Sequence, residues 1–270
     1  MTEVITVVQR TPMTLPVVFD TFDIAAADGD ADSYLVRPDD GRTHPGLLLL
    51  MDAFGLRPWL REMMETIAAH GFTVLAPNIF YRSGRAPLLP LPNPAEPDGQ
   101  TNFFAALAPV RQQLTPDNTM ADVKTYLDRL SACQFVAPGA LAVTGYCMGG
   151  RLALRTAGAY GSRIAAAASF HGGRLAVEDA PDSPHHAAND ITAELLIAHA
   201  DRDVSMPADQ ITLLDSALDV AGVRFTSAVY RDARHGFTMR DTPAFSEAAY
   251  ERHLHALLAL LDRTFANGTA

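Results

Sequence analysis

A cysteine, Cys147, lies between glycines in the stretch GYCMGG, where an apolar run ends and a helical pattern begins. Residues 145–149 match the G-x-nucleophile-x-G pattern of a nucleophile elbow, with a thiol in place of serine. Such an elbow is a tight, strained turn that needs small neighbours. It also brings the nucleophile to a helix N-terminus, where the helix dipole and free N–H groups stabilise negative charge. The stretch therefore predicts a nucleophilic cysteine.

A thiol nucleophile needs a general base, an acid that orients the base, and donors for the oxyanion. With this elbow, the expected chain order is nucleophile, acid, histidine. Asp201 and Asp203 both follow the predicted strand 193–200, and His235 follows the predicted strand 223–230. Spacing leaves the choice between the two acids open. His235 is the predicted general base, a role that contributes about 10²- to 10⁴-fold in rate.

The other histidines are interpreted mainly as structural or surface residues. The exception is His171, which directly follows the predicted strand 163–170 and is a candidate for contact with the site. His185 and His186 are adjacent in a loop, but no further ligands accompany them at a spacing typical of a metal site. We therefore expect no metal, and the predicted chemistry requires no organic cofactor.

Strands and helices alternate along the 270 residues, which predicts βαβ units in an α/β fold. Continuous apolar runs such as the one at 46–51 indicate strands covered on both faces. We expect one domain over residues 1–270, with a mostly parallel central sheet and helices on both faces. The expected strands are 33–38, 44–55, 72–77, 140–145, 163–170, 193–200 and 223–230, and the expected helices are 57–71, 118–132, 207–222, 243–265 and one that begins near residue 147.

The segment 83–116 interrupts this alternation. It is rich in proline and too long for an ordinary connection. One interpretation is an insertion over the mouth of the sheet that acts as a lid, with a short helix at 101–114. The other is a surface loop with no role in chemistry. The sequence leaves both open.

Composition and charge exclude several functions. The net charge is −10 and no block of lysines or arginines occurs, which argues against a nucleic-acid partner. Residues 1–16 lack the basic and apolar regions of a signal peptide, so we expect a cytoplasmic protein with no membrane partner. The second cysteine, Cys133, is interpreted as a buried apolar residue, because two cysteines do not make a disulfide framework. No pattern indicates the oligomeric state.

Five stretches in this chain order, MDAFG, APNIFYR, GYCMGG, DRDVSMP and HGF, resemble the active-site segments of the dienelactone hydrolase family. The resemblance extends from about Asp32 to the C-terminal helix. It implies an α/β-hydrolase fold and a hydrolase whose small-molecule substrate is an ester or a lactone, cleaved through a thioester on Cys147. Two alternatives stay open: a general carboxylesterase for neutral substrates, and a non-catalytic relative that binds a ligand or senses oxidation through its thiol.

The resemblance also assigns roles that spacing leaves open. The family's acid precedes two residues and an apolar–proline pair, which matches residues 203–207 and implies Asp203 rather than Asp201. The second oxyanion donor of such hydrolases comes from the loop after an early strand. Here that donor would be the backbone N–H of Ala53, paired with that of Met148.

Three positions depart from the family or match it loosely. Asp52 stands where the family has a glutamate thought to activate the thiol; its shorter carboxylate either keeps that role or accepts a hydrogen bond within its loop. Arg82 matches an arginine that holds the substrate carboxylate in the family. Arg240 lies near the position of a second such arginine, one residue farther from His235 than the family pattern places it.

Overall fold

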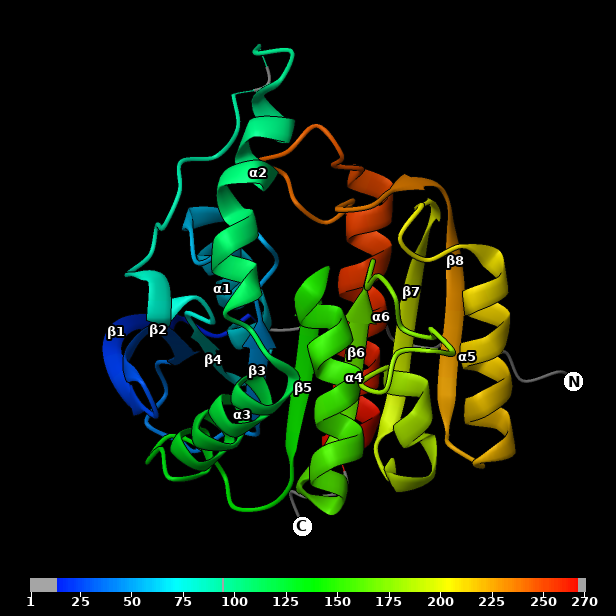
Figure 1. Cartoon of the computed structure of the whole chain (residues 1–270). Coiled ribbons are helices and arrows are strands. Elements are labelled where there is room, and N and C mark those ends of the chain that lie inside the picture. Colours follow the sequence, from blue (N-terminus) through cyan, green and yellow to red (C-terminus); the bar gives the residue numbers. More distant parts are fainter. Residues whose placement is uncertain (1–13, 94, 267–270) are drawn as a thin grey trace, which may run out of the picture.

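A computed structural model describes residues 14–93 and 95–266 as one eight-stranded sheet flanked by helices (Figure 1). The prediction that the N-terminal segment is not a signal peptide rests mostly on residues 1–13, which lie outside this part of the chain. The strands are β1 (Val17–Ala26), β2 (Gly29–Pro38), β3 (Gly46–Leu50), β4 (Thr73–Pro77), β5 (Leu141–Tyr146), β6 (Ile164–Phe170), β7 (Glu194–Arg202) and β8 (Phe225–Arg234). The α-helices are α1 (Pro58–Ala68), α2 (Gly99–Gln112), α3 (Pro116–Ser131), α4 (Met148–Tyr160), α5 (Ala208–Val220) and α6 (Glu247–Phe265).

The sheet is mostly parallel, which confirms the predicted fold class. Its strand order is β1-β2-β4-β3-β5-β6-β7-β8. Only the pairs β1–β2 and β2–β4 are antiparallel. Parallel pairing along the remaining strands brings their carboxyl ends to one edge of the sheet, where α/β proteins place their ligand sites.

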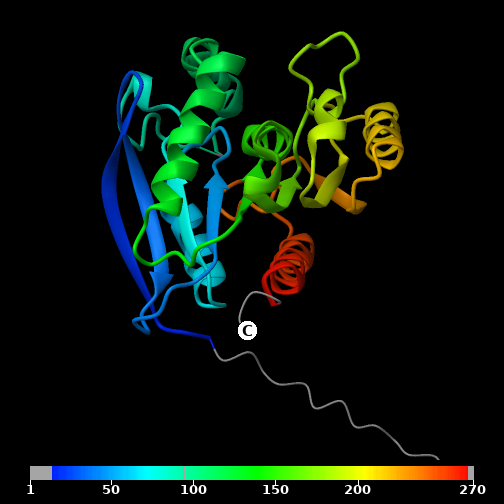
Figure 2. The same cartoon turned by 90° about the horizontal axis from the view of Figure 1, so that it is seen from below.

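Helices cover both faces of the sheet. Figure 2, seen from below, places α3, α4 and α5 on one side of the strands and α1 and α6 on the other. This double cover explains the uninterrupted apolar runs: all five residues of β3 and all five of β4 are buried, because neither face of these strands meets water. Within the described residues, no helix is both long and apolar enough to cross a membrane.

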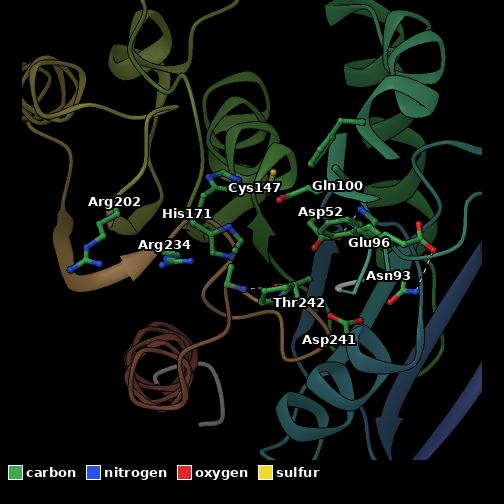
Figure 3. Close-up of a pocket in the computed structure, with 18 of the residues that line it drawn as sticks. Asp52, Asn93, Glu96, Gln100, Cys147, His171, Arg202, Arg234, Asp241 and Thr242 are labelled. Carbon is green, nitrogen blue, oxygen red and sulfur yellow. Dashed lines mark hydrogen bonds between the residues drawn. The ribbon is translucent and has the colours of Figure 1, made fainter. Parts of the chain in front are cut away.

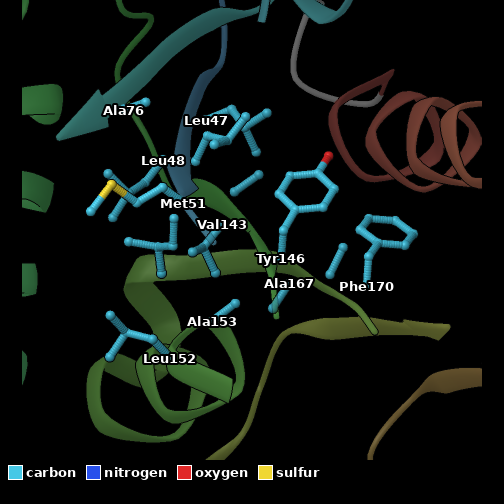
Figure 4. Close-up of a cluster of buried hydrophobic side chains, with 14 of the residues drawn as sticks. Leu47, Leu48, Met51, Ala76, Val143, Tyr146, Leu152, Ala153, Ala167 and Phe170 are labelled. Carbon is cyan, nitrogen blue, oxygen red and sulfur yellow. The ribbon is translucent and has the colours of Figure 1, made fainter. Parts of the chain in front are cut away.

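The core beneath β5 fixes the end of that strand (Figure 4). The ring of Tyr146, the last residue of β5, stacks on Phe170 with centroids 5.5 Å apart. Its buried hydroxyl is within 3.0 Å of His253 Nε2, so the polar end of the side chain has a partner. Because Tyr146 directly precedes Cys147, this packing holds the turn at Cys147 in place.

Several features differ from the sequence-based expectations. Strand β3 ends at Leu50, although the strand was expected to extend over 44–55, and α6 begins at Glu247 rather than at residue 243. Strand β1 was not predicted; it is an edge strand whose apolar residues are interrupted by the exposed Asp20 and Asp23. The segment 83–116 does contain the expected helix, although α2 begins at Gly99 rather than at residue 101 and ends at Gln112.

Candidate active site

Cys147 occupies the turn between β5 and α4 that the elbow pattern predicts. Its backbone has φ 56° and ψ −117°, a strained conformation for a residue with a side chain. The flanking glycines allow this close approach. A Cβ on Gly145 would lie 1.9 Å from the Gly149 carbonyl oxygen, and one on Gly149 would lie 2.1 Å from the Leu50 carbonyl oxygen. Strand and helix can therefore meet here only where both positions lack side chains.

His235 and Asp203 form a hydrogen-bonded pair at the carboxyl ends of β8 and β7. The distance from His235 Nδ1 to Asp203 Oδ2 is 2.6 Å, and the Asp203 side chain is 2% exposed. The Ser205 hydroxyl and backbone N–H both donate to Asp203 Oδ1, at 2.6 and 2.9 Å, which fixes the carboxylate. Asp201 instead accepts the backbone N–H of Asp232 at 3.0 Å. The structure thus brings Asp203, not Asp201, to the histidine.

The surroundings of His235 favour its protonated form. Burial lowers the pKa of His235, but hydrogen bonds to Asp203 and Cys147, together with the negative charge of both groups, raise this pKa to about 10. Burial raises the pKa of Asp203, but the hydrogen bond from His235 and those from Ser205 outweigh it, so the net shift is downward. His235 is therefore held between Cys147 and Asp203.

This coupling predicts a specific dependence of stability on pH. Because the pKa of His235 is raised from 6.5 to about 10, the pair stabilises the folded state fully below pH 6.5, and the contribution is lost as pH rises through about 10. The lowered pKa of Asp203 preserves the contribution above pH 3.8. We expect Asp203→Asn to reduce the free energy of unfolding by about 1–2 kcal/mol near pH 5.5 and by much less near pH 10, a magnitude discounted for the exposure of His235.

Urea unfolding at both pH values measures this difference. Asp201→Asn is the control, since its carboxylate contacts only backbone N–H at the surface. A loss for Asp203→Asn that stays the same from pH 5.5 to pH 10 would show that protonation of His235 is not linked to folding.

Cys147, His171 and His235 line a cavity of about 490 Å³ at the carboxyl edge of the sheet. Figure 3 places Arg202 and Arg234 to one side of Cys147, and Asp52, Glu96 and Asp241 to the other. The wall also includes residues from the segment 83–116, namely Pro92, Asn93, Glu96, Pro97, Gln100 and Phe104.

One predicted oxyanion donor shares the cavity wall with Cys147, and the other directly follows Cys147 in the chain. Ala53 is in the cavity wall. Met148 is the first residue of α4, and the first N–H groups of a helix have no acceptor within the helix. Both residues stay candidates for holding the oxyanion.

Asp52 belongs to a buried ion cluster that sequence reasoning missed. Arg57 Nη1 and Nη2 donate to the two Asp52 carboxylate oxygens at 2.7 and 3.0 Å, and Arg57 Nε donates to Asp241 Oδ2 at 2.6 Å. Asp52 Oδ1 also accepts the N–H of Phe54 at 3.0 Å. Both carboxylate oxygens of Asp52 thus accept hydrogen bonds. This supports the interpretation that Asp52 accepts a hydrogen bond within its loop over the interpretation that it activates the Cys147 thiol. Burial raises the pKa of Asp52, and the charge of Arg57 opposes this shift.

The structure does not bring Arg82 or Arg240 to the cavity. Arg82 donates to Asp28 at 2.7 Å and to Asp122 at 2.5 and 3.1 Å, and Asp122 is itself buried. Arg240 lies over the Trp59 ring, 4.2 Å from its centroid, and its side chain is half exposed. Neither residue is part of the cavity wall.

Arg202 and Arg234 are the arginines that do line the cavity. They are cross-strand neighbours at the ends of β7 and β8. Arg202 is paired with Asp232 at 2.6 Å, whereas the Arg234 guanidinium has no hydrogen-bond or ion-pair partner in the described part of the chain. Sequence reasoning missed Arg234, although its position directly before His235 was a signal that it lies near the site.

His171 packs against His235, the predicted general base, as its position after β6 suggested. Its ring centroid is 5.3 Å from that of His235, and its Nε2 is 2.8 Å from Thr238 Oγ1. Burial holds the pKa of His171 well below 6.5, so its imidazole is neutral at neutral pH. His171 is therefore a candidate for positioning the His235 ring.

A family model described as "Dienelactone hydrolase family" matches residues 31–265. The chain belongs to the dienelactone hydrolase family. A relative in Salmonella typhi named "Putative carboxymethylenebutenolidase" is 26% identical over 234 residues, covering 84% of this chain and 80% of the relative. The carboxymethylenebutenolidase of Pseudomonas sp. (strain P51) is 29% identical over 133 residues, 49% of this chain and 52% of the relative.

Solved structures agree with this membership at the level of the fold. The dienelactone hydrolase-like promiscuous phosphotriesterase P91 from metagenomic libraries has a TM-score of 0.71 at 20% identity, covering 92% of this chain and 98% of the other. An acylaminoacyl peptidase from Pyrococcus horikoshii has a TM-score of 0.65 at 16% identity, covering 89% of this chain and 41% of the other. The α/β-hydrolase fold expected for a dienelactone hydrolase family member is thereby confirmed.

Proposed function

We propose that this chain is a hydrolase that cleaves an ester or a lactone through a thioester on Cys147. The observation that carries the proposal is the common cavity: the strained Cys147 and His235, whose Nδ1 is bonded to Asp203, line one space of about 490 Å³. A nucleophile, a base and an orienting acid in this arrangement perform acyl transfer. Membership of the dienelactone hydrolase family supports the same reaction class.

In the proposed mechanism, the Cys147 thiolate attacks the substrate carbonyl carbon, and His235 is its protonated partner. The backbone N–H groups of Ala53 and Met148 hold the oxyanion. His235 then donates its proton to the leaving alkoxide or enolate oxygen as the C–O bond breaks. Water, deprotonated by His235, attacks the thioester carbonyl and releases the acid, which restores the thiolate and the protonated histidine. Asp203 keeps Nδ1 of His235 oriented throughout.

The segment 83–116 is proposed to cover this reaction from solvent. Glu96, Gln100 and Phe104 lie in the cavity wall. Phe103 packs on Phe54 with ring centroids 4.9 Å apart, so α2 rests on the loop that carries Ala53. This contact supports the lid interpretation over that of a loop with no role in chemistry.

The substrate is proposed to carry a carboxylate that meets Arg234. The names of the relatives point to carboxylated lactones, and Arg234 is the cavity arginine whose guanidinium is unpaired. Acidic Asp52, Glu96 and Asp241 lie on the opposite side of Cys147 (Figure 3), so an anionic group is directed toward Arg234.

Arg234→Gln is expected to raise KM for a carboxylated lactone by about 10- to 100-fold with little change for a neutral aryl ester, since a guanidinium–carboxylate bond contributes about 1.5–3 kcal/mol. Steady-state kinetics on both substrates measures the effect. Arg240→Gln is the matched control, because Arg240 lies outside the cavity and is half exposed. Equal losses on both substrates would remove the carboxylate-binding role of Arg234.

The direct test of the proposed function is hydrolysis of a carboxylated dienelactone beside a neutral aryl ester by the full-length protein. Turnover of the lactone supports the proposed substrate class. Turnover of the neutral ester alone would replace it with a general carboxylesterase that keeps the same residues. Turnover of neither, with a thiol at Cys147 that still reacts with alkylating reagents, would favour a ligand-binding or redox-sensing relative.

A further inference from the structure

A second cavity lies behind the nucleophile helix, on the side of α4 that faces the α2–α3 connection. Its volume is about 170 Å³. Its wall includes Arg111, Met148, Arg151, Arg155 and Asp182. It shares no lining residue with the catalytic cavity.

Positive charge dominates this second cavity. Three arginines face a single acid, Asp182, in a chain whose net charge is −10. Arg151 is already paired with Asp182 at 2.8 Å and also donates to the Arg174 carbonyl oxygen. Asp182 is 4.0 Å from Arg155, so one carboxylate is divided between two guanidinium groups. The three arginines therefore carry more positive charge than Asp182 neutralises, and the wall of the second cavity has a net positive charge.

Two of the three guanidinium groups, those of Arg111 and Arg155, keep N–H groups that can donate to a ligand. Arg155 has only the longer contact with Asp182 and a 3.3 Å bond to the Pro116 carbonyl oxygen. Burial lowers the pKa of Arg155, and the charge of Asp182 opposes this shift only in part. Arg111, at the end of α2, has no partner for its guanidinium in the described part of the chain. Planar guanidinium groups converging on one space are suited to an oxyanion.

We infer that this cavity binds a phosphate-type oxyanion between Arg111 of α2 and Arg155 of α4. The bound anion would connect the last turn of α2, the helix proposed to cover the catalytic cavity, to the helix that begins beside Cys147 (Figure 1). Met148 is in the wall of the same cavity, so the anion would also lie behind a proposed oxyanion donor.

Calorimetric titration of the full-length protein with inorganic phosphate at low ionic strength tests the inference. We expect saturable binding at one site, weakened about tenfold or more by Arg111→Gln and by Arg155→Gln, since each removes a charge-assisted bond. Arg163→Gln is the matched control, because Arg163 is a surface arginine paired with Asp128 at 2.8 Å. Arg111 is exposed, so its variant avoids the risk that a buried substitution prevents folding.

Further variants separate this site from the catalytic cavity. Phosphate binding that survives Arg234→Gln and Cys147→Ala supports the second cavity whether or not the protein proves to be a hydrolase. Absence of saturable binding, or a loss with Arg234→Gln but not with Arg111→Gln, would overturn the inference. Titration with methyl phosphate separates two possible ligands of this site. If methyl phosphate binds as tightly as inorganic phosphate, the natural ligand is the phosphoryl group of a larger molecule. If methyl phosphate binds more weakly, the natural ligand is the free phosphate ion, and either result supports the site.

Discussion

Cys147→Ala is expected to reduce kcat for ester or lactone hydrolysis by about 10⁴-fold or more, because the variant has no nucleophile to form the acyl intermediate. The small side chain fits the turn, whose backbone is set by the neighbouring glycines and by the bond from the residue 147 N–H to the Phe170 carbonyl oxygen. The fold and the substrate affinity should therefore be preserved. Steady-state kinetics together with a thermal unfolding curve measures both properties.

Cys133→Ala is the matched control for this variant. Cys133 follows α3, is also a free thiol, and lies outside both cavities. The Cys133→Ala variant should therefore have the kcat of the wild-type protein. If Cys147→Ala kept more than about a tenth of wild-type turnover, the reaction would not pass through this thiol, and a water activated directly by His235 would be the better account.

Asp203→Asn is expected to reduce kcat by about 10³- to 10⁴-fold, whereas Asp201→Asn should change it by less than about threefold. An amide at 203 can hold the histidine in the wrong tautomer and does not stabilise the protonated ring. The 2.6 Å contact with His235 Nδ1 belongs to Asp203, while Asp201 bonds to the backbone of Asp232. Initial rates of both variants at several pH values give the comparison.

A reversed ranking of these two variants would mean that the loop after β7 takes another arrangement during catalysis. Ser205→Ala offers an intermediate test, since the Ser205 hydroxyl donates to Asp203 Oδ1 at 2.6 Å and lies 3.3 Å from His235 Nδ1. It should lower kcat less than Asp203→Asn does, because the Ser205 backbone N–H still holds the same oxygen.

Local sequence patterns predicted the fold and the strained turn at Cys147 well. Apolar runs such as Leu47–Leu50 are continuous because both faces of the sheet are covered, and this signal is strong in any single segment. The elbow at Cys147 was equally visible, since its glycines are required by contacts within a few residues and with the adjacent strand. The choice of Asp203 over Asp201 needed more than spacing, because both acids follow the same strand.

Long-range ion pairs account for what the sequence did not reveal. Arg82 was expected at the substrate, but its partners Asp28 and Asp122 are 54 and 40 residues away in the chain, so no local pattern shows that they occupy it. The cluster of Arg57 with Asp241 spans 184 residues. One signal was available: an arginine at the start of a helix is unfavourable beside the helix dipole, which indicates that Arg57 has another partner.

The central claim is that hydrolysis passes through a thioester on Cys147, and rapid-quench mass spectrometry tests it most directly. The wild-type protein is mixed with excess p-nitrophenyl ester, quenched in acid within the first turnover, and analysed as intact protein and as peptides. The account predicts a transient acyl adduct, labile to hydroxylamine, on the peptide that contains Cys147. Turnover with no adduct, or with the acyl group on a different residue, would contradict it.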